Sequence, residues 1–189
     1  SRYDIYFEHF DPDLYDPTIW AKAAKNAGMK YFVITSKHHE GFCLWDSALT
    51  DYKVTNTPCG KDLLVPMVDA FRHEGLKIGF YHSLLDWHHP DFPIDGLHSQ
   101  RNDKELREKE KNRDVTKYAD YLCGQSAELM DRFSPDIMWY DFSYSAFMED
   151  GGKGKDDWQS ERVIEMLRKK NPNILINDRL EIDQDFKTP

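Results

Sequence analysis

Residues 26–35, NAGMKYFVIT, join the end of a helical pattern to a short apolar run, and residues 73–82, HEGLKIGFYH, repeat this arrangement. In both segments a glycine ends the helix and an apolar-Lys-apolar phrase leads into the run. With two further runs, the expected strands are residues 31–35, 77–82, 136–141 (DIMWYD) and 174–177 (ILIN). All four are rich in β-branched or aromatic residues, which predicts strands buried on both faces, as in a parallel sheet.

Helical patterns alternate with these strands at residues 16–27, 62–73, 104–133 and 157–169. Asp16 is placed to cap the first helix, and Pro17 occupies its first helical position. Such alternation predicts an α/β protein whose parallel strands are joined by right-handed crossovers. Four units amount to about half of a (β/α)₈ TIM-like barrel, which typically needs about 250 residues. A flavodoxin-like sheet is the alternative.

The composition argues against several classes of protein. The 189 residues carry a net charge of −9, which disfavours nucleic-acid binding, and no apolar run approaches the length of a membrane-spanning helix. Three cysteines without a C-x-x-C pair disfavour a disulfide framework and a thiolate zinc site. The glycine-rich residues 151–155 lack the G-K-[ST] of a phosphate-binding loop. Because the chain starts at Ser1 and stops after a loop-like stretch, we expect it to be a piece of a longer protein.

Chemically useful side chains gather where the expected strands end, which is where a parallel barrel builds its active site. The four strand ends carry Lys37, His38, His39 and Glu40; Tyr81, His82, Ser83, Asp86, Trp87, His88 and His89; Trp139, Tyr140 and Asp141; and Asn177, Asp178 and Arg179. Five of the eight histidines fall in the first two groups, whereas surface histidines would scatter.

Structural roles are the alternative for several of these residues. Neighbours on a strand point to opposite faces, so one of His38 and His39 is open to packing against a helix. The His88-His89 pair lies further into its loop and is open to solvation. The alternative for Trp139 is a ring in the hydrophobic core, and the alternative for Asp141 is a cap of a turn or helix.

Rings beside carboxylates and imidazoles are typical of sugar recognition, because the C–H faces of a pyranose pack on rings while its hydroxyls need polar partners. Glycoside hydrolysis also needs two carboxyl groups. Asp141 is the clear candidate, and Glu40, Asp86 and Asp178 remain open for the second. A metal-dependent hydrolase is the competing interpretation, but adjacent histidines are poorly spaced for a shared metal, so we expect no metal and no cofactor.

Several motifs, taken together, resemble the α-L-fucosidases of glycoside hydrolase family 29. The similarity extends over about residues 8–189, in order and in spacing. Its motifs are TSKHHEGFCLW at 35–45, YKVT at 52–55, KDLL at 61–64, GLKIGFYHSLLDW at 75–87, PDIMWYD at 135–141 and NDR at 177–179. The resemblance implies a partial catalytic barrel over residues 1–189, covering about strands two to five, with the first strand, the later strands and a β-sandwich outside the chain.

The resemblance also implies roles for individual residues. The family's nucleophile falls on Asp141, and its fucose-binding histidines fall on His38 and His39. Substrate-binding positions fall on Tyr81, Trp139, Arg179 and Trp45. The acid/base of many members is a Glu that follows a D-F-x-T-x phrase, and DFKTP at 185–189 matches that phrase, so this Glu is expected beyond Pro189.

The implied activity is that of a retaining exo-α-L-fucosidase acting on fucosylated oligosaccharides or glycoconjugates, with no nucleic-acid or membrane partner. The family suggests a secreted, periplasmic or lysosomal location. A non-catalytic fucose-binding barrel and a metal-dependent barrel hydrolase are the alternatives. Residues 1–189 expressed alone are expected to be inactive and to be poorly soluble or self-associating, because inward rings such as Phe32, Phe80 and Trp139 would lose partners.

Overall fold

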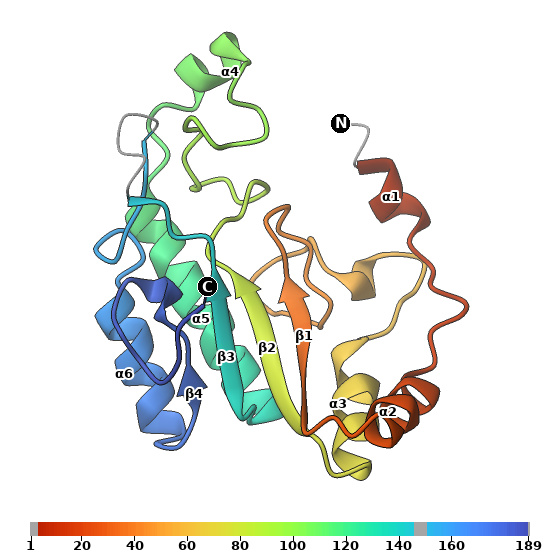
Figure 1. Cartoon of the computed structure of the whole chain (residues 1–189). Helices are drawn as coiled ribbons and strands as arrows, with labels where there is room; N and C mark the ends of the chain where they lie inside the picture. Colours follow the sequence, from red (N-terminus) through yellow and green to blue (C-terminus); the bar gives the residue numbers. More distant parts are fainter. Residues whose placement is uncertain (1–3, 146–150, 189) are drawn as a thin grey trace.

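A computed structural model of the chain describes residues 4–145 and 151–188, and its centre is a four-stranded parallel sheet. The strands are β1 (Tyr31–Lys37), β2 (Lys77–Ser83), β3 (Ile137–Asp141) and β4 (Leu175–Ile176). They lie in the order β1-β2-β3-β4, all pointing the same way (Figure 1). Each expected strand is present within one or two residues at either end, so the parallel α/β prediction is confirmed.

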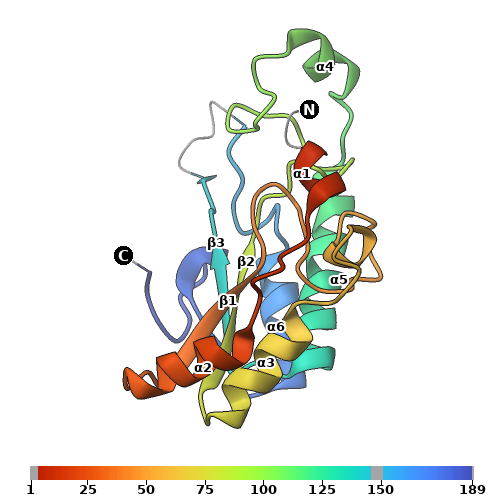
Figure 2. The same cartoon turned by 90° about the vertical axis from the view of Figure 1, so that its right-hand side faces the viewer.

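The order of the strands distinguishes the two architectures that the sequence left open. A flavodoxin-like sheet reverses its strand order and carries helices on both faces. Here every strand lies beside the next one in the chain, and α3 (Leu64–His73), α5 (Val115–Phe133) and α6 (Ser160–Lys170) cover one face (Figures 1 and 2). The flavodoxin-like alternative is therefore wrong, and the arrangement is that of consecutive units of a barrel wall.

The helices agree with the sequence except in two places. The first expected helix is α2 (Pro17–Asn26), where the Asp16 carboxylate accepts hydrogen bonds from the backbone N–H groups of Thr18 and Ile19. The single helix expected at 104–133 is wrong: α4 (Lys104–Lys109) and α5 are separate. The break has a local cause, because the Asp114 side chain accepts from the Thr116 N–H and starts a new helix there. Helix α1 (Asp4–His9) was not expected.

The helix-facing side of the sheet is an aromatic and aliphatic core. Phe32 stacks on Phe71 of α3 with ring centroids 4.2 Å apart, and Phe80 meets Phe133 of α5 at 5.4 Å. Both rings therefore pack under helices and not into a barrel interior, which corrects the expectation that they would lose partners there. Trp139 faces the other side, where its ring meets Phe186 at 5.6 Å.

Side chains complete the sheet where β4 is short. Asn177 follows the two-residue strand, and its buried amide both accepts from the Tyr140 N–H at 2.9 Å and donates to the Tyr140 carbonyl at 2.8 Å. This side-chain pairing continues the contact between β3 and β4 to the end of β3. Beyond it lies η3 (Asp178–Leu180), a short 3₁₀ helix.

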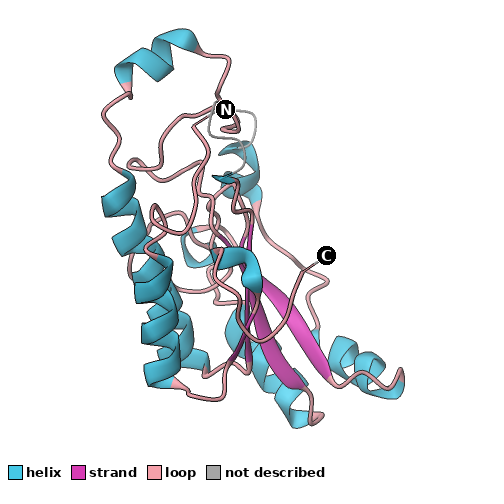
Figure 3. Ribbon diagram, turned by 60° about the vertical axis from the view of Figure 1, so that its left-hand side comes forward, coloured by secondary structure: helices cyan, strands magenta, loops and turns pink. Residues whose placement is uncertain are grey.

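Loops form much of the molecule above the carboxyl ends of the strands (Figure 3). Among the residues described, no helix has both the length and the apolar character needed to cross a bilayer.

Candidate active site

The carboxyl ends of β1, β2 and β3 bring four of the predicted site residues into contact. The Tyr81 hydroxyl donates to Asp141 Oδ2 at 2.8 Å. The His38 ring lies parallel to the Tyr81 ring, with centroids 5.6 Å apart and planes 11° apart, and it lies 4.1 Å from the His39 ring. These contacts follow from the register, because Tyr81 pairs with Trp139 and Ser83 with Asp141. We call His38, His39, Tyr81 and Asp141 the strand-end cluster.

The tyrosine of the cluster is a permanent hydrogen-bond donor. Burial and the hydrogen bond to the Asp141 carboxylate both raise the pKa of Tyr81 far above its usual value, so the hydroxyl stays protonated. Asp141 itself is only partly buried. One of its oxygens is therefore held by Tyr81, while the carboxyl group remains reachable from the open side of the sheet.

His39 is neutral and held in one orientation. Burial, and secondarily the neighbouring His38, lowers the pKa of His39 to about 4, against a weaker opposing effect of Asp141. Its Nδ1 lies 2.6 Å from the Ser83 hydroxyl, which itself donates to the Leu85 carbonyl at 2.9 Å. Because the Ser83 proton is directed at Leu85, His39 Nδ1 donates to Ser83, and Nε2 is left as an acceptor.

His38 is the more open of the two histidines. Its side chain is 50% exposed, and Nδ1 lies 3.4 Å from Glu40 Oε2. Strand β1 ends at Lys37, so the alternation that would send adjacent side chains to opposite faces no longer applies at 38 and 39. Both rings therefore lie in the cluster, and the structure does not support the alternative that one of them packs under a helix.

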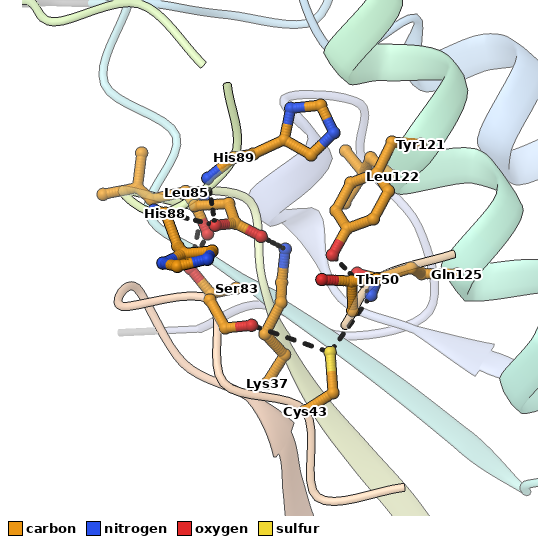
Figure 4. Close-up of polar contacts among 12 residues, drawn as sticks. Lys37, Cys43, Thr50, Ser83, Leu85, His88, His89, Tyr121, Leu122 and Gln125 are labelled. Carbon is orange, nitrogen blue, oxygen red and sulfur yellow. Dashed lines mark hydrogen bonds and ion pairs between the residues drawn. The ribbon is translucent and has the colours of Figure 1, made fainter. Parts of the chain in front are cut away.

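A buried ion pair underlies the cluster. Lys37 Nζ lies 3.1 Å from Asp86 Oδ2, with both side chains almost fully buried, and it also donates to the Tyr118 hydroxyl. Asp86 Oδ1 accepts from the backbone N–H groups of His88 and His89 (Figure 4). The second carboxylate proposed from composition is thus not Asp86, because its oxygens are already engaged in holding the loop after β2.

Three residues expected at the site need separate comment. Trp139 is partly buried on β3 next to Asp141, and Arg179 lies on η3, which packs beside β3. Trp45 is different: its side chain has no exposed surface, and its Nε1 donates to Glu128 Oε2 at 3.2 Å. In this conformation Trp45 cannot touch a ligand, so its assignment as a substrate-binding residue is corrected to a core role.

The histidines of the loop after β2 lie outside the cluster. The His88 ring stacks on Tyr52 at 4.0 Å, and the His89 ring packs against Tyr121 at 4.3 Å. Of the remaining carboxylates, Asp178 accepts from the Thr188 N–H, and Glu40 lies beside His38. Glu40 also borders an aromatic hollow of about 560 Å³ that is lined by Tyr6, Phe7, Phe10, Phe42 and Tyr52.

The loop after β3 is joined to the loop after β2 by a second buried ion pair. Lys153 pairs with Asp95, and each side chain is only 6% exposed. The Tyr144 hydroxyl donates to the same Asp95 oxygen at 2.6 Å. We call Asp95, Tyr144 and Lys153 the loop clamp. Sequence analysis did not predict it, because Asp95 lies about 50 to 60 residues before its two partners.

Within residues 4–145 and 151–188, no group of three His, Cys, Asp or Glu side chains is arranged to hold an ion.

Comparison with known proteins gives the same result as the motifs. The sequence pattern of the family described as alpha-L-fucosidase matches residues 1–188. The chain belongs to the α-L-fucosidase family. Curated relatives include the alpha-L-fucosidase of Dictyostelium discoideum, 28% identical over 94% of this chain and 36% of that protein. Another is the tissue alpha-L-fucosidase of Rattus norvegicus, 26% identical over 94% of this chain and 35% of the relative. The chain thus spans about a third of the length of these fucosidases.

Solved fucosidases share the fold. Alpha-L-fucosidase isoenzyme 1 from Paenibacillus thiaminolyticus has a TM-score of 0.91 at 46% identity, over 99% of this chain and 46% of its own. A family 29 fucosidase from Bacteroides thetaiotaomicron, solved as a trapped covalent intermediate with 2-fluoro-fucosyl fluoride, has a TM-score of 0.76 at 32% identity, over 96% of this chain and 39% of its own. Since the catalytic domain of these fucosidases is a (β/α)₈ barrel, the four units here are part of such a barrel.

Proposed function

We propose that the protein hydrolyses terminal α-L-fucosidic bonds with retention of configuration, and that Asp141 is its nucleophile. The observation that carries the proposal is the strand-end cluster: a reachable carboxylate, held at one oxygen by Tyr81, lies beside two imidazoles at the carboxyl edge of a barrel sheet. Membership of the α-L-fucosidase family supports α-L-fucose as the sugar that is released.

In the first step, an Asp141 oxygen forms a bond to the anomeric carbon of fucose while the bond to the leaving-group oxygen breaks. A general acid supplies the proton that the leaving group takes. In the second step, water adds to the anomeric carbon, its proton passes to the same acid/base group, and Asp141 leaves. The trapped covalent intermediate of the Bacteroides enzyme supports a two-step course by analogy.

The acid/base group is proposed to be a Glu beyond Pro189, after the phrase at 185–189. The phrase at 185–188 lies against the cluster's neighbours, because Phe186 meets Trp139 at 5.6 Å and the Thr188 N–H donates to Asp178. A Glu that follows this phrase would start from a position near Trp139, on the strand that ends at Asp141. Retention calls for two carboxyl groups roughly 5 to 5.5 Å apart.

The neutral His39 is suited to accept a hydrogen bond from a sugar hydroxyl at Nε2, since Nδ1 is committed to Ser83. His38, beside Glu40, is suited to bind a neighbouring hydroxyl. Trp139 offers a ring face for the C–H side of the sugar. Such contacts accelerate the reaction to the extent that they strengthen in the transition state.

The test is Asp141→Gly in the protein at its natural length, with an aryl α-L-fucoside as substrate. We expect kcat to fall by about 10³-fold or more, since covalent catalysis is lost. Asp183→Asn, at an exposed carboxylate, is the matched control and should keep wild-type turnover. Near wild-type turnover by Asp141→Gly would rule out the assigned role.

Two further measurements on the same protein test the alternative functions. A fucose-binding barrel without activity would bind fucose, with loss of binding in His38→Ala, but would release no aglycone. A metal-dependent hydrolase would lose activity on treatment with a chelator and regain it when the metal is returned.

A further inference from the structure

The residue after the proposed nucleophile has an unusual backbone. Phe142 has a φ of +75°, in the left-handed region that side chains with a Cβ rarely adopt. Among the residues described, three other non-glycine residues share it: Ser134, Gln159 and Glu181. Ser134 and Glu181 follow the ends of α5 and η3, where a left-handed residue commonly ends a helix, and Gln159 directly precedes α6. Phe142 instead follows a strand directly, at the edge that carries the cluster.

Contacts on both sides hold Phe142 in this conformation. Before it, the Asp141 carbonyl accepts from the Leu84 N–H at 3.0 Å. After it, the Tyr144 N–H donates to the Lys153 carbonyl at 3.0 Å, and the Ser143 hydroxyl accepts from Trp158 Nε1. A conformation that costs energy persists only where its surroundings determine it this completely.

The turn places the Phe142 ring against His39. The two ring centroids are 5.0 Å apart with an interplanar angle of 65°, and Phe142 is 37% exposed. His39 also contacts the rings of His38 at 4.1 Å and Trp87 at 5.5 Å, while Ser83 holds its Nδ1. Phe142 thus supplies part of the burial of His39 from the strand that carries Asp141.

Glycine would make the same turn without strain, so a turn alone gives no reason for a phenylalanine here. We propose that Phe142 is a positioning residue, whose strained turn holds its ring on His39 and thereby fixes the imidazole relative to the Asp141 carboxylate. The role in turnover rests on the proposed fucosidase function. The charged and titratable groups around His39 are His38, Asp141 and Lys37. The Phe142 ring carries no charge, so it acts on His39 only by contact and by excluding water.

Three substitutions separate the ring from the backbone in the protein at its natural length. Phe142→Tyr keeps both, Phe142→Ala keeps the strain without the ring, and Phe142→Gly removes both. We expect Phe142→Gly to melt at a higher temperature than Phe142→Ala, because only glycine adopts this backbone freely. We expect both to lose about 10- to 100-fold in kcat/KM, as for a misplaced substrate contact, while Phe142→Tyr stays within about twofold of the wild type.

The readout specific to positioning is the titration of His39. Its pKa should rise toward the ordinary value in Phe142→Ala and Phe142→Gly, as followed by NMR, and the acid limb of kcat/KM should move to higher pH with it. Gln159→Gly, at a left-handed position away from the cluster, should leave the His39 pKa and kcat/KM unchanged.

Wild-type kcat/KM together with an unchanged His39 pKa in Phe142→Gly would overturn the proposal. If the wild-type protein hydrolyses no fucoside, the proposed function fails, whereas the NMR titration still decides whether Phe142 controls the state of His39.

Discussion

The two edges of the sheet carry ion pairs of similar length in opposite surroundings. At the amino edge, Lys77 Nζ lies 2.8 Å from Asp136 Oδ1, with side chains that are 71% and 33% exposed. At the carboxyl edge, the Lys37–Asp86 pair measures 3.1 Å with exposures of 0% and 2%. A Lys–Asp ion pair is therefore exposed to solvent at the amino edge and buried in the protein at the carboxyl edge. The comparison teaches that the edge with the cluster is built by buried charges, which are costly to leave without a partner.

The largest expected effect comes from breaking the buried pair. Lys37→Met should lower the free energy of unfolding by about 3–5 kcal/mol, because it leaves the Asp86 carboxylate buried without its cation. Lys77→Met should cost less than about 1 kcal/mol, as exposed pairs do. Urea unfolding of the two variants measures the difference, and equal losses would contradict the contrast between the edges. The double variant Lys37→Met with Asp86→Leu should regain part of the loss, since no charge is then left alone.

Two glycines give the next comparison. Gly28 at the amino edge and Gly41 beside the cluster both have left-handed backbones, with φ of +81° and +89°. A Cβ on Gly28 would meet nothing within 4 Å, whereas one on Gly41 would come within 2.2 Å of Asp86 Oδ1. Gly28→Ala should therefore cost about 1–2 kcal/mol for the backbone alone, and Gly41→Ala about 2–4 kcal/mol with the clash added. Thermal unfolding measures both losses, and a larger loss of stability in Gly28→Ala than in Gly41→Ala would contradict the prediction.

Acidification should weaken the carboxyl edge through the half-buried His39. The pKa of His39 is lowered to about 4, below the ordinary value near 6.5, so between these values the unfolded chain binds a proton that the folded chain does not. Stability is therefore full above about pH 6.5 and falls as the pH drops toward 4. His82, His89 and His98 have lowered pKa values too and act in the same direction. His39→Asn should make the decline of melting temperature shallower, and an unchanged slope would count against a neutral His39.

The smallest expected effect lies at the amino edge. Asp136 Oδ2 accepts from the Ile78 N–H at 3.0 Å in addition to its pairing with Lys77. Asp136→Asn keeps an acceptor for that N–H and removes only the exposed charge interaction, so it should cost less than about 1 kcal/mol. A larger loss in urea unfolding would show that the exposed Lys77–Asp136 pair contributes more to the free energy of unfolding than its exposure predicts.

The elements that the sequence predicted well are those with local causes. A glycine after a helical stripe and a short apolar run define each αβ unit, so strands β1 to β3 were predictable almost to the residue. The break at Asp114 has a local cause as well, but a capping aspartate within a charged stretch is easily taken for one more polar residue of a helix. Helix α1 has too few residues for any periodicity to show.

The candidate site was predictable as a set of residue types and not as a set of partners. Strand ends collected His38, His39, Tyr81 and Asp141 because parallel strands end at one edge. The neighbouring sequence does not reveal that Lys37 pairs with Asp86 or that Trp45 donates to Glu128. The first pairing removes one candidate for the second catalytic carboxylate. Such pairings join residues about 50 to 80 positions apart, and only the packed structure fixes them.

The loop clamp has a consequence for motion. Asp95 belongs to the loop after β2, and Tyr144 and Lys153 belong to the loop after β3, so neither loop can lift without separating a buried charge from its partner. The two loops should therefore open together, as one cooperative unit, and their amide hydrogens should exchange with solvent at a common opening rate. Lys153→Met would uncouple them and give two different exchange rates. Two loops that are far apart in the sequence would in this way move as one unit above the carboxyl edge of the sheet.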